Sequence, residues 1–345
     1  MPIIFSDFKV LRVGYLFIAL LLGCSSGPVI MESSPSAAQG DEPQYKTGDV
    51  RTVNIPGTEV TFSLVYVAGG SFMMGSSETE EGRDTDEGPQ RDTKLDGYWI
   101  GQYEVTDNAF SVFRYPDRDA DTTAVAGAFY DVNAVSRPSP PYEDPAFGMG
   151  GNAKPAVGMT QWGALHFAKW LTQKTGVFFR LPTEAEWENA CRAGTDTPFS
   201  FGLDEADLDE YGWYEDNSEY TLQRVGQKLP NDWGLYDMHG NASEWTMDEY
   251  VSTYFQDTAS KNPWVEPSRL HPRTVRGGAY DDPSSEARCA NRLESTLNWK
   301  RRDPQIPKSF WWNTDAPFLG FRLVAPEAGM SEDDQLFFWT MVLGE

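Results

Sequence analysis

Two neighbouring segments carry the strongest helix signals in this sequence. A fold with little helix is therefore predicted. Thr160 precedes apolar residues at helical spacing, and Gly176 ends that segment. Thr183 and Glu186 form a capping box, in which a hydroxyl and a carboxylate bind free amides at the start of a helix. Two main helices are therefore predicted, and the second places Cys191 on a buried face.

Short strands and long loops are predicted for the rest of the folded part. Alternating and β-branched residues predict strands over residues 60–67 and 98–105, and Thr106 or Asp107 is predicted to cap a short helix that reaches Phe113. Residues 124–155 are rich in Gly and Pro, which indicates an irregular insertion. Two helices among many short strands define an α+β domain with short antiparallel strands.

The N-terminus has the pattern of an export signal. Lys9 and Arg12 precede an apolar run at residues 13–22 that is too short to cross a bilayer. The run ends at Gly23 and Cys24, which resembles the signal of a bacterial lipoprotein, where the Cys thiol is acylated after cleavage. Several acyl chains on Cys24 would give a firm anchor. An ordinary signal peptide followed by an incidental Cys is the alternative.

These patterns divide the chain into a signal peptide (1–23), a flexible tether (24–48), a folded domain (49–326) and a C-terminal extension (327–345). The tether is rich in Ser, Pro, Ala and Gly, as flexible linkers are. Ser25 follows the Cys, and in lipoproteins of this kind the absence of Asp there implies the outer membrane. We therefore expect the protein in the bacterial cell envelope, with the membrane as a partner through its lipid anchor.

The charge of the chain excludes one class of partner. Its 28 Lys and Arg stand against 52 Asp and Glu, for a net charge of −24. Such a surface repels a phosphate backbone, so nucleic acid is excluded as a partner. It suits cations and cationic ligands, or it serves solubility alone.

Three cysteines restrict the redox chemistry: Cys24, Cys191 and Cys289. If Cys24 carries lipid, two thiols remain in an oxidising compartment, and a disulfide between them is the economical inference. Two separately buried thiols are the alternative. The three His are too dispersed in sequence to predict a metal triad.

Five stretches, taken in order, resemble the sulfatase-modifying-factor family, whose best-known member is the formylglycine-generating enzyme. They are AGGSFMMG at 68–75, IGQYEVT at 100–106, RLPTEAEWE at 180–188, WGLYDMHGNASEW at 233–245, and RGG at 276–278 with RCANR at 288–292 and GFR at 320–322. The resemblance implies a C-type-lectin-like fold with little regular structure. It also implies that Cys191 and Cys289 form a structural bridge.

The resemblance does not extend to the catalytic thiols of the enzyme. The enzyme oxidises a substrate Cys with two of its own Cys, which bind copper(I), and soft thiolates suit that ion. The matching segment here, residues 279–287, reads AYDDPSSEA and contains no Cys. We therefore expect no copper and no formylglycine formation. Whether the domain is an enzyme of another kind stays open, and a domain without enzymatic activity is favoured.

The family also places a structural calcium ion on the stretch from Asp237 to Glu244. The implied ligands are the side chains of Asp237 and Glu244 and the carbonyls of Gly240 and Ala242. Hard oxygen ligands of this kind suit Ca²⁺. A metal-free turn, in which Glu244 pairs with a base such as Arg276, is the alternative.

The leading functional hypothesis is a non-oxidase binding or accessory module for a protein, peptide or glycan of the envelope. Its ligand groove is predicted from Asp281, Asp282, Arg288, Arg292 and Trp299. The alternative for the arginines is a structural role, in which they pair with buried carboxylates. A second hypothesis is an enzyme of other chemistry, with Asp281 or Asp282 as a general base. A third is the oxidase itself, rescued by Cys289.

Overall fold

The computed structural model describes residues 44–119 and 135–344. The predicted signal peptide, Cys24 and most of the tether lie outside these residues, as does part of the insertion at 124–155. Among the residues it does describe, we find no helix with the length and apolar character that a membrane span requires.

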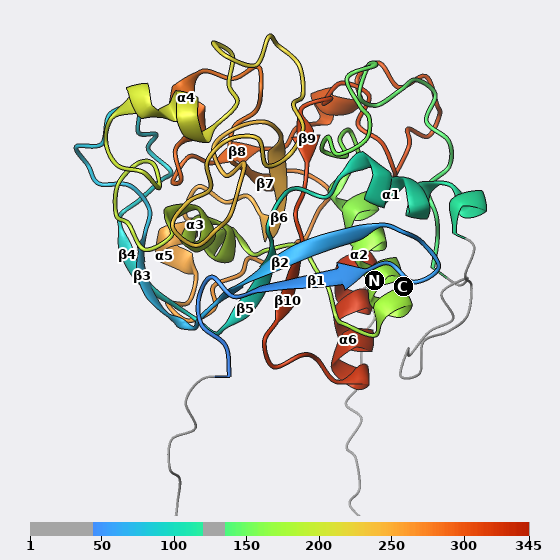
Figure 1. Ribbon diagram of the computed structural model, residues 1–345, viewed down its shortest axis with the longest axis horizontal. Helices are drawn as coiled ribbons and strands as arrows, with labels where there is room; N and C mark the ends of the chain where they lie inside the picture. Colours follow the sequence, from blue (N-terminus) through green and yellow to red (C-terminus); the bar gives the residue numbers. More distant parts are fainter. Residues whose placement is uncertain (1–43, 120–134, 345) are drawn as a thin grey trace, which may run out of the picture. The chain divides into compact units, whose positions relative to one another are not determined.

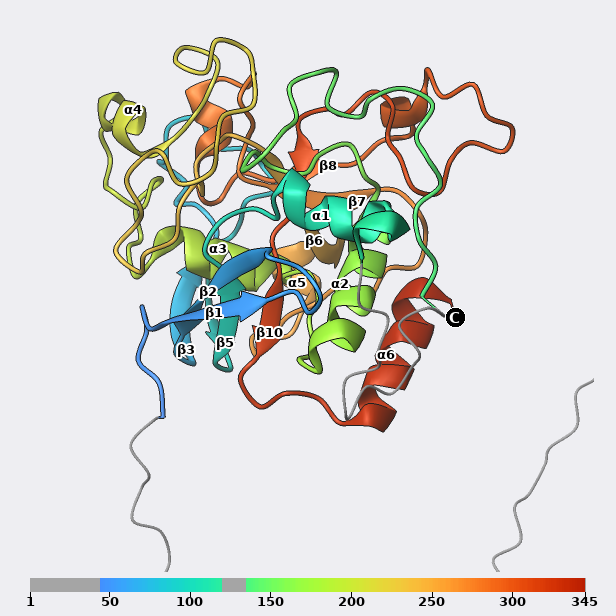
Figure 2. The ribbon, with the colours of Figure 1, turned by 45° about the vertical axis from the view of Figure 1, so that its right-hand side comes forward.

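The described residues form short strands, six α-helices and several single 3₁₀ turns (Figures 1 and 2). The strands are β1 (Val50–Asn54), β2 (Thr61–Val67), β3 (Gly70–Met74), β4 (Arg91–Leu95), β5 (Tyr98–Gly101), β6 (Ser243–Glu249), β7 (Arg273–Arg276), β8 (Leu293–Glu294), β9 (Leu319–Gly320) and β10 (Val324–Pro326). The helices are α1 (Asp107–Arg114), α2 (Gln161–Thr175), α3 (Glu184–Arg192), α4 (Leu208–Tyr211), α5 (Tyr254–Asp257) and α6 (Glu332–Leu343).

The strands form three small sheets. The first has the order β1-β2-β5-β10 and is antiparallel throughout, with Val324 of β10 opposite Ile100 of β5. The second is the hairpin β3-β4. The third has the order β8-β7-β6-β9, in which only β6 and β9 are parallel. The two larger sheets each join distant parts of the sequence, and this confirms the predicted α+β class with short, mainly antiparallel strands.

The two predicted helix starts are confirmed in detail. The Thr160 hydroxyl accepts a hydrogen bond from the Gly163 amide, and Gly176 ends α2 in a left-handed conformation. At α3, the Glu186 amide donates to the Thr183 hydroxyl and the Thr183 amide donates to the Glu186 carboxylate, which is a complete capping box.

One predicted strand is longer than the structure shows. The prediction covered residues 98–105, whereas β5 ends at Gly101. Beyond it, the Gln102 amide still donates to Ser63 O of β2, whereas the Val105 amide donates to Phe321 O, so the chain leaves the sheet between these two residues. Thr106 then precedes α1, although its side chain makes no capping hydrogen bond.

The predicted extension at 327–345 contributes a helix to the main core. Figures 1 and 2 both show α6 beside α2. Phe338 and Trp339 are buried and pack with their ring centroids 5.3 and 5.6 Å from that of Phe178. Because α6 is longer than α3, the fold has more main helices than the two that were predicted.

We expect Thr183→Ala to lower the free energy of unfolding by about 1 kcal/mol, because an amide at the start of α3 loses its acceptor. Urea denaturation followed by tryptophan fluorescence measures this change. Thr183→Ser, which keeps the hydroxyl, should retain most of the stability. An Ala variant with an unchanged urea midpoint would contradict a stabilising role for this cap.

Candidate functional site

The segment that replaces the enzyme's catalytic residues is held by backbone contacts. The Tyr280 amide donates to Asn241 O, and the Ser218 hydroxyl donates to Tyr280 O at 2.5 Å. The Glu215 amide donates to Asp282 O at 3.0 Å. These contacts place Asp281 and Asp282 beside the loop that carries Glu215.

Asp282 lies in an acidic setting. Asp281 is exposed and Asp282 is partly buried, so neither occupies a closed pocket. Burial, followed by the charges of Asp281 and Glu286, raises the pKa of Asp282 to about 7. A cationic ligand that approached these carboxylates would relieve their mutual repulsion.

The two arginines predicted to face a groove are instead buried in ion pairs. Arg288 is 3% exposed and binds Glu87 through two hydrogen bonds of 2.7 and 2.8 Å, with Glu80 as a second partner at 2.9 Å. Arg292 binds Glu184, at 2.5 Å from Nε to Oε1, and Asp86. The groove prediction was therefore wrong for both residues. Their donors are already used, as in the structural alternative.

Trp299 is also directed into the core. Its ring packs 5.7 Å from that of Trp245 and 5.6 Å from that of Phe318, measured between centroids. It is partly buried and packs against the main hydrophobic cluster, and no hydrogen bond or ring contact joins it to Asp281 or Asp282 in the described part of the chain. In the following loop, Trp312 is buried, whereas Phe310 is exposed.

A cavity of about 510 Å³ lies elsewhere, between the end of α1 and the loop at residues 140–151. Arg114, Tyr115 and Tyr142 are among the residues that line it, and none of the five predicted groove residues does. Sequence reasoning missed it because its walls come from an irregular insertion without a recognisable motif.

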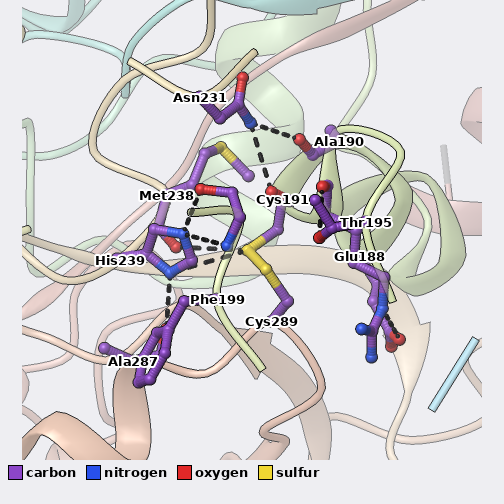
Figure 3. The surroundings of a disulfide bond; sticks show 12 residues. Glu188, Ala190, Cys191, Thr195, Phe199, Asn231, Met238, His239, Ala287 and Cys289 are labelled. Atoms are coloured by element: carbon purple, nitrogen blue, oxygen red, sulfur yellow. Dashed lines mark hydrogen bonds and ion pairs between the residues drawn. A yellow bond between two sulfur atoms is a disulfide. The ribbon is translucent and has the colours of Figure 1, made fainter. Parts of the chain in front are cut away.

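Cys191 and Cys289 form a disulfide that joins α3 to the segment before β8. Both are completely buried. Figure 3 shows Asn231 beside the bond, where its amide donates to the carbonyls of Ala190 and Cys191. The bridge therefore fastens the C-terminal half of α3, and neither sulfur has access to solvent.

His239 lies against the disulfide in its neutral form. Its Nδ1 donates to Ala287 O at 2.8 Å (Figure 3). Its Nε2 lies 2.8 Å from the Ser200 hydroxyl. Burial lowers the pKa of His239 to about 4. A carbonyl only accepts, so the hydrogen sits on Nδ1, the nitrogen nearer to Cys191 Sγ.

These residues do not fit the copper ion of the oxidase. Copper(I) prefers thiolate ligands. In the described part of the chain, both cysteines are in the disulfide, and residues 279–287 contain no Cys. The rescue of the oxidase by Cys289 would therefore require that the bridge be reduced first.

The expected calcium ligands fit only in part. Both oxygens of Glu244 accept hydrogen bonds from Arg322, at 2.7–2.9 Å, and Oε2 also accepts one from the Trp187 indole. Glu244 thus pairs with an arginine, as the metal-free alternative expected, but the partner is Arg322 and not Arg276. Asp237, in contrast, has a buried oxygen, Oδ1, that no donor reaches among the described residues.

Beside Asp237 lies Glu104, a residue that the sequence analysis did not single out. It is 2% exposed, and its Oε2 also has no hydrogen-bond partner within the described ranges. It lies three residues after the end of β5, and the local sequence there does not indicate a partner far along the chain. Gly240, whose φ is +106°, is needed nearby because a Cβ there would lie 2.0 Å from Trp213 O.

A loop-rich α+β domain with a buried bridge and buried arginine–carboxylate pairs is the class of protein that this structure defines. A family described as "Sulfatase-modifying factor enzyme 1-like domain" matches residues 55–325. The chain belongs to that family.

Three relatives illustrate its range. The chain is 27% identical to the serine/threonine-protein kinase pkn1 of Chlamydia caviae, over 66% of this chain and 35% of the kinase, so it spans about a third of that relative. It is 26% identical to the formylglycine-generating enzyme of Thermomonospora curvata, over 64% of this chain and 84% of the enzyme. The structure of PvdO from Pseudomonas aeruginosa matches with a TM-score of 0.63 and 26% identity, over 82% of this chain and 99% of PvdO.

We expect Arg288→Ala to lower the free energy of unfolding by about 3–5 kcal/mol, because Glu87 would keep a buried charge without a partner. Chemical denaturation measures this loss. Arg302→Ala provides the matched control, since Arg302 is 58% exposed and its pair with Asp315 is worth roughly 0–1 kcal/mol. Equal effects of the two substitutions would contradict the structural role of Arg288.

Proposed function

We propose that this chain is a lipid-anchored protein of the bacterial cell envelope whose domain binds a partner and does not oxidise one. The observation that carries the proposal is that neither cysteine of the described residues, 44–119 and 135–344, offers a thiolate. Cys191 and Cys289 are joined and buried, and carboxylates occupy the segment where the family's enzyme has its catalytic cysteines. A fold can persist while its chemistry changes, so membership of the family does not require the enzyme's activity.

The partner that best fits the surface around Asp281 and Asp282 carries positive charge. Arg288 and Arg292 are committed to buried carboxylates, and the charges that act on Asp282 are those of Asp281, Glu286 and Glu215, which are all acidic. The raised pKa of Asp282, caused by burial and by neighbouring carboxylates, means that a bound cation would favour its ionised form. We therefore propose a peptide segment rich in Lys or Arg, displayed by another envelope protein, as the ligand.

The location rests on the sequence of the N-terminus. An apolar run that ends in Gly23-Cys24 supports acylation, and the residue after it, Ser25, supports the outer membrane. The tether would allow the domain to reach a partner at some distance from the bilayer.

A second candidate function is catalysis by Asp282 as a general base. A pKa near 7 favours it, because an efficient base has a pKa close to the working pH. The exposure of Asp281 and the partial exposure of Asp282 count against it, since an effective base of this kind is usually enclosed.

We expect the affinity of the full chain for an oligolysine peptide to rise roughly fivefold between pH 6 and pH 8, because Asp282 ionises near pH 7 and an exposed charge pair contributes about 1 kcal/mol. Fluorescence anisotropy of a labelled peptide measures the affinity. Asp282→Asn should remove the rise. Glu59→Gln, at another exposed carboxylate, should leave it intact, and a pH profile that persists in Asp282→Asn would count against the proposed surface.

The same variants test the biological partner. A crosslinking pull-down from membranes should lose one specific protein with Asp282→Asn and keep it with Glu59→Gln. An unchanged set of captured proteins would indicate an inert surface. Conversion of a sulfatase-derived Cys peptide to formylglycine by the copper-loaded protein would overturn the non-oxidase proposal itself.

We expect Cys24→Ser to abolish incorporation of labelled palmitate and to release the protein from the outer-membrane fraction, because the proposed acylation site would be lost. Fractionation on a density gradient and immunoblotting measure the distribution. Wild-type protein that is found free in the periplasm would support an ordinary signal peptide in place of the lipoprotein signal.

A further inference from the structure

The cavity beside α1 contains two arginines that form no ion pair within the described residues. Its volume of about 510 Å³ lies within the range of roughly 300–1,000 Å³ that small-molecule sites occupy. Arg114, from the last turn of α1, and Arg118, from the short turn Pro116–Arg118, both line it. The Nε of Arg114 is buried, and no acceptor in the described part of the chain reaches it. These guanidinium groups therefore have donors available for a ligand.

Aromatic rings hold both guanidinium groups in position. Arg114 Cζ lies 4.9 Å from the ring centroid of Tyr115 and 4.9 Å from that of Trp312, and Arg118 Cζ lies 4.8 Å from that of Tyr115. A cation–π contact uses the face of the planar group and leaves the N–H donors at its edge. The two arginines are thus held in place without being saturated, in contrast to Arg288.

The nearest acidic groups are already used. Asp119 directly follows Arg118, but its carboxylate binds Arg137 at 2.6 Å and Lys174 at 2.7 Å. Asp144 lines the cavity, and each of its side-chain oxygens accepts a hydrogen bond from a backbone amide of its own loop, at 3.1 and 2.7 Å. Neither acid is available to compensate the two arginines, so a ligand with negative charge would do so.

The opposite wall of the cavity offers an acceptor and an aromatic ring. Asp107 lines the cavity, and none of the described residues donates a hydrogen bond to its side chain. Burial raises the pKa of Asp107, against the charge of Arg114, and a hydroxyl that donated to this carboxylate would favour its ionised form. Tyr142 also lines the cavity and is 69% exposed, so its ring is accessible to a ligand.

We propose that this cavity binds a sugar acid, with Arg114 and Arg118 donating to its carboxylate and Asp107 accepting from its hydroxyl groups. Guanidinium groups recognise a carboxylate through paired, charge-assisted hydrogen bonds. The acidic side chain of a peptide could satisfy the arginines but would bring no hydroxyl to Asp107. The cavity shares no lining residue with the surface around Asp281 and Asp282, so the proposal does not depend on the function assigned to that surface.

Isothermal titration calorimetry of the full chain with trigalacturonic acid tests the proposal, and galactotriose is the matched neutral sugar. We expect the acid to bind at least about tenfold more tightly, because the neutral sugar leaves the guanidinium groups without charged partners. Galacturonic acid itself distinguishes the sources of the ligand. Equal affinity for the monomer would indicate a free sugar acid, and tighter binding of the trimer would indicate an acidic polysaccharide.

A matched pair of arginine variants tests the site. Arg118 is exposed, so Arg118→Gln should fold normally, and we expect it to weaken binding of trigalacturonic acid by about tenfold. Arg302→Gln is the control, since Arg302 is also exposed and does not line the cavity, and it should leave the affinity unchanged. Asp282→Asn should leave it unchanged as well, which separates this site from the acidic surface.

Three results would overturn the proposal. Equal affinity of the wild-type chain for trigalacturonic acid and galactotriose would exclude a role for the arginines, as would equal effects of Arg118→Gln and Arg302→Gln. Tighter binding of hexaglutamate than of trigalacturonic acid would assign the cavity to an acidic peptide. Absence of any heat of binding with the wild-type chain would contradict a sugar-acid site of any kind.

Discussion

Buried arginines that bind backbone carbonyls hold this fold together. A domain with so little regular structure brings loops into its interior, and the polar groups of those loops need partners. Arg276 binds the carbonyls of Cys289 and Asn291 through Nη1, each at 2.8 Å. Its Nη2 donates to Glu188 of α3 at 2.6 Å, and its Nε forms an ion pair with Glu184 of the same helix at 3.2 Å. One side chain thus satisfies two loop carbonyls and fastens β7 to a helix, and the carboxylates neutralise its charge.

The same requirement explains why the predicted groove is absent. Arg288 donates to Gly82 O as well as to Glu87, and Arg292 donates to Asp86 O and Val251 O as well as to Glu184. These guanidinium groups complete the hydrogen bonding of loops that lie far away in the sequence. A guanidinium used in this way has little capacity left for a ligand, so the surface near Asp282 is acidic and not mixed in charge.

The disulfide has a related consequence for function. It joins both cysteines of the described domain and buries them beside a neutral His239. The bridge stabilises the position of α3 and removes the thiolates on which the family's copper chemistry depends. The scaffold of the family is retained while the reactive segment carries carboxylates. A change from thiols to carboxylates favours the binding of cations over the oxidation of a thiol, and this is the physical basis of the proposed role.

Local features of the chain were predictable because they depend on neighbours in sequence. The capping box at Thr183, the cap at Thr160 and the stop at Gly176 each involve residues within one helical turn, and the order of the five motifs was sufficient to indicate the family. The end of β5 and the packing of α6 were not predictable in this way, because each depends on contacts with segments that lie elsewhere in the chain.

The sequence alone determined the class of the fold, the positions of the helix starts and the absence of Cys from residues 279–287. Only the tertiary structure decided which carboxylate meets which arginine. Glu244 could have paired with Arg276 or held a cation by itself, and Glu104 gave no signal at all. Glu244 and Arg322 are 78 residues apart, so the long-range path of the loops selects this pair and local propensity does not.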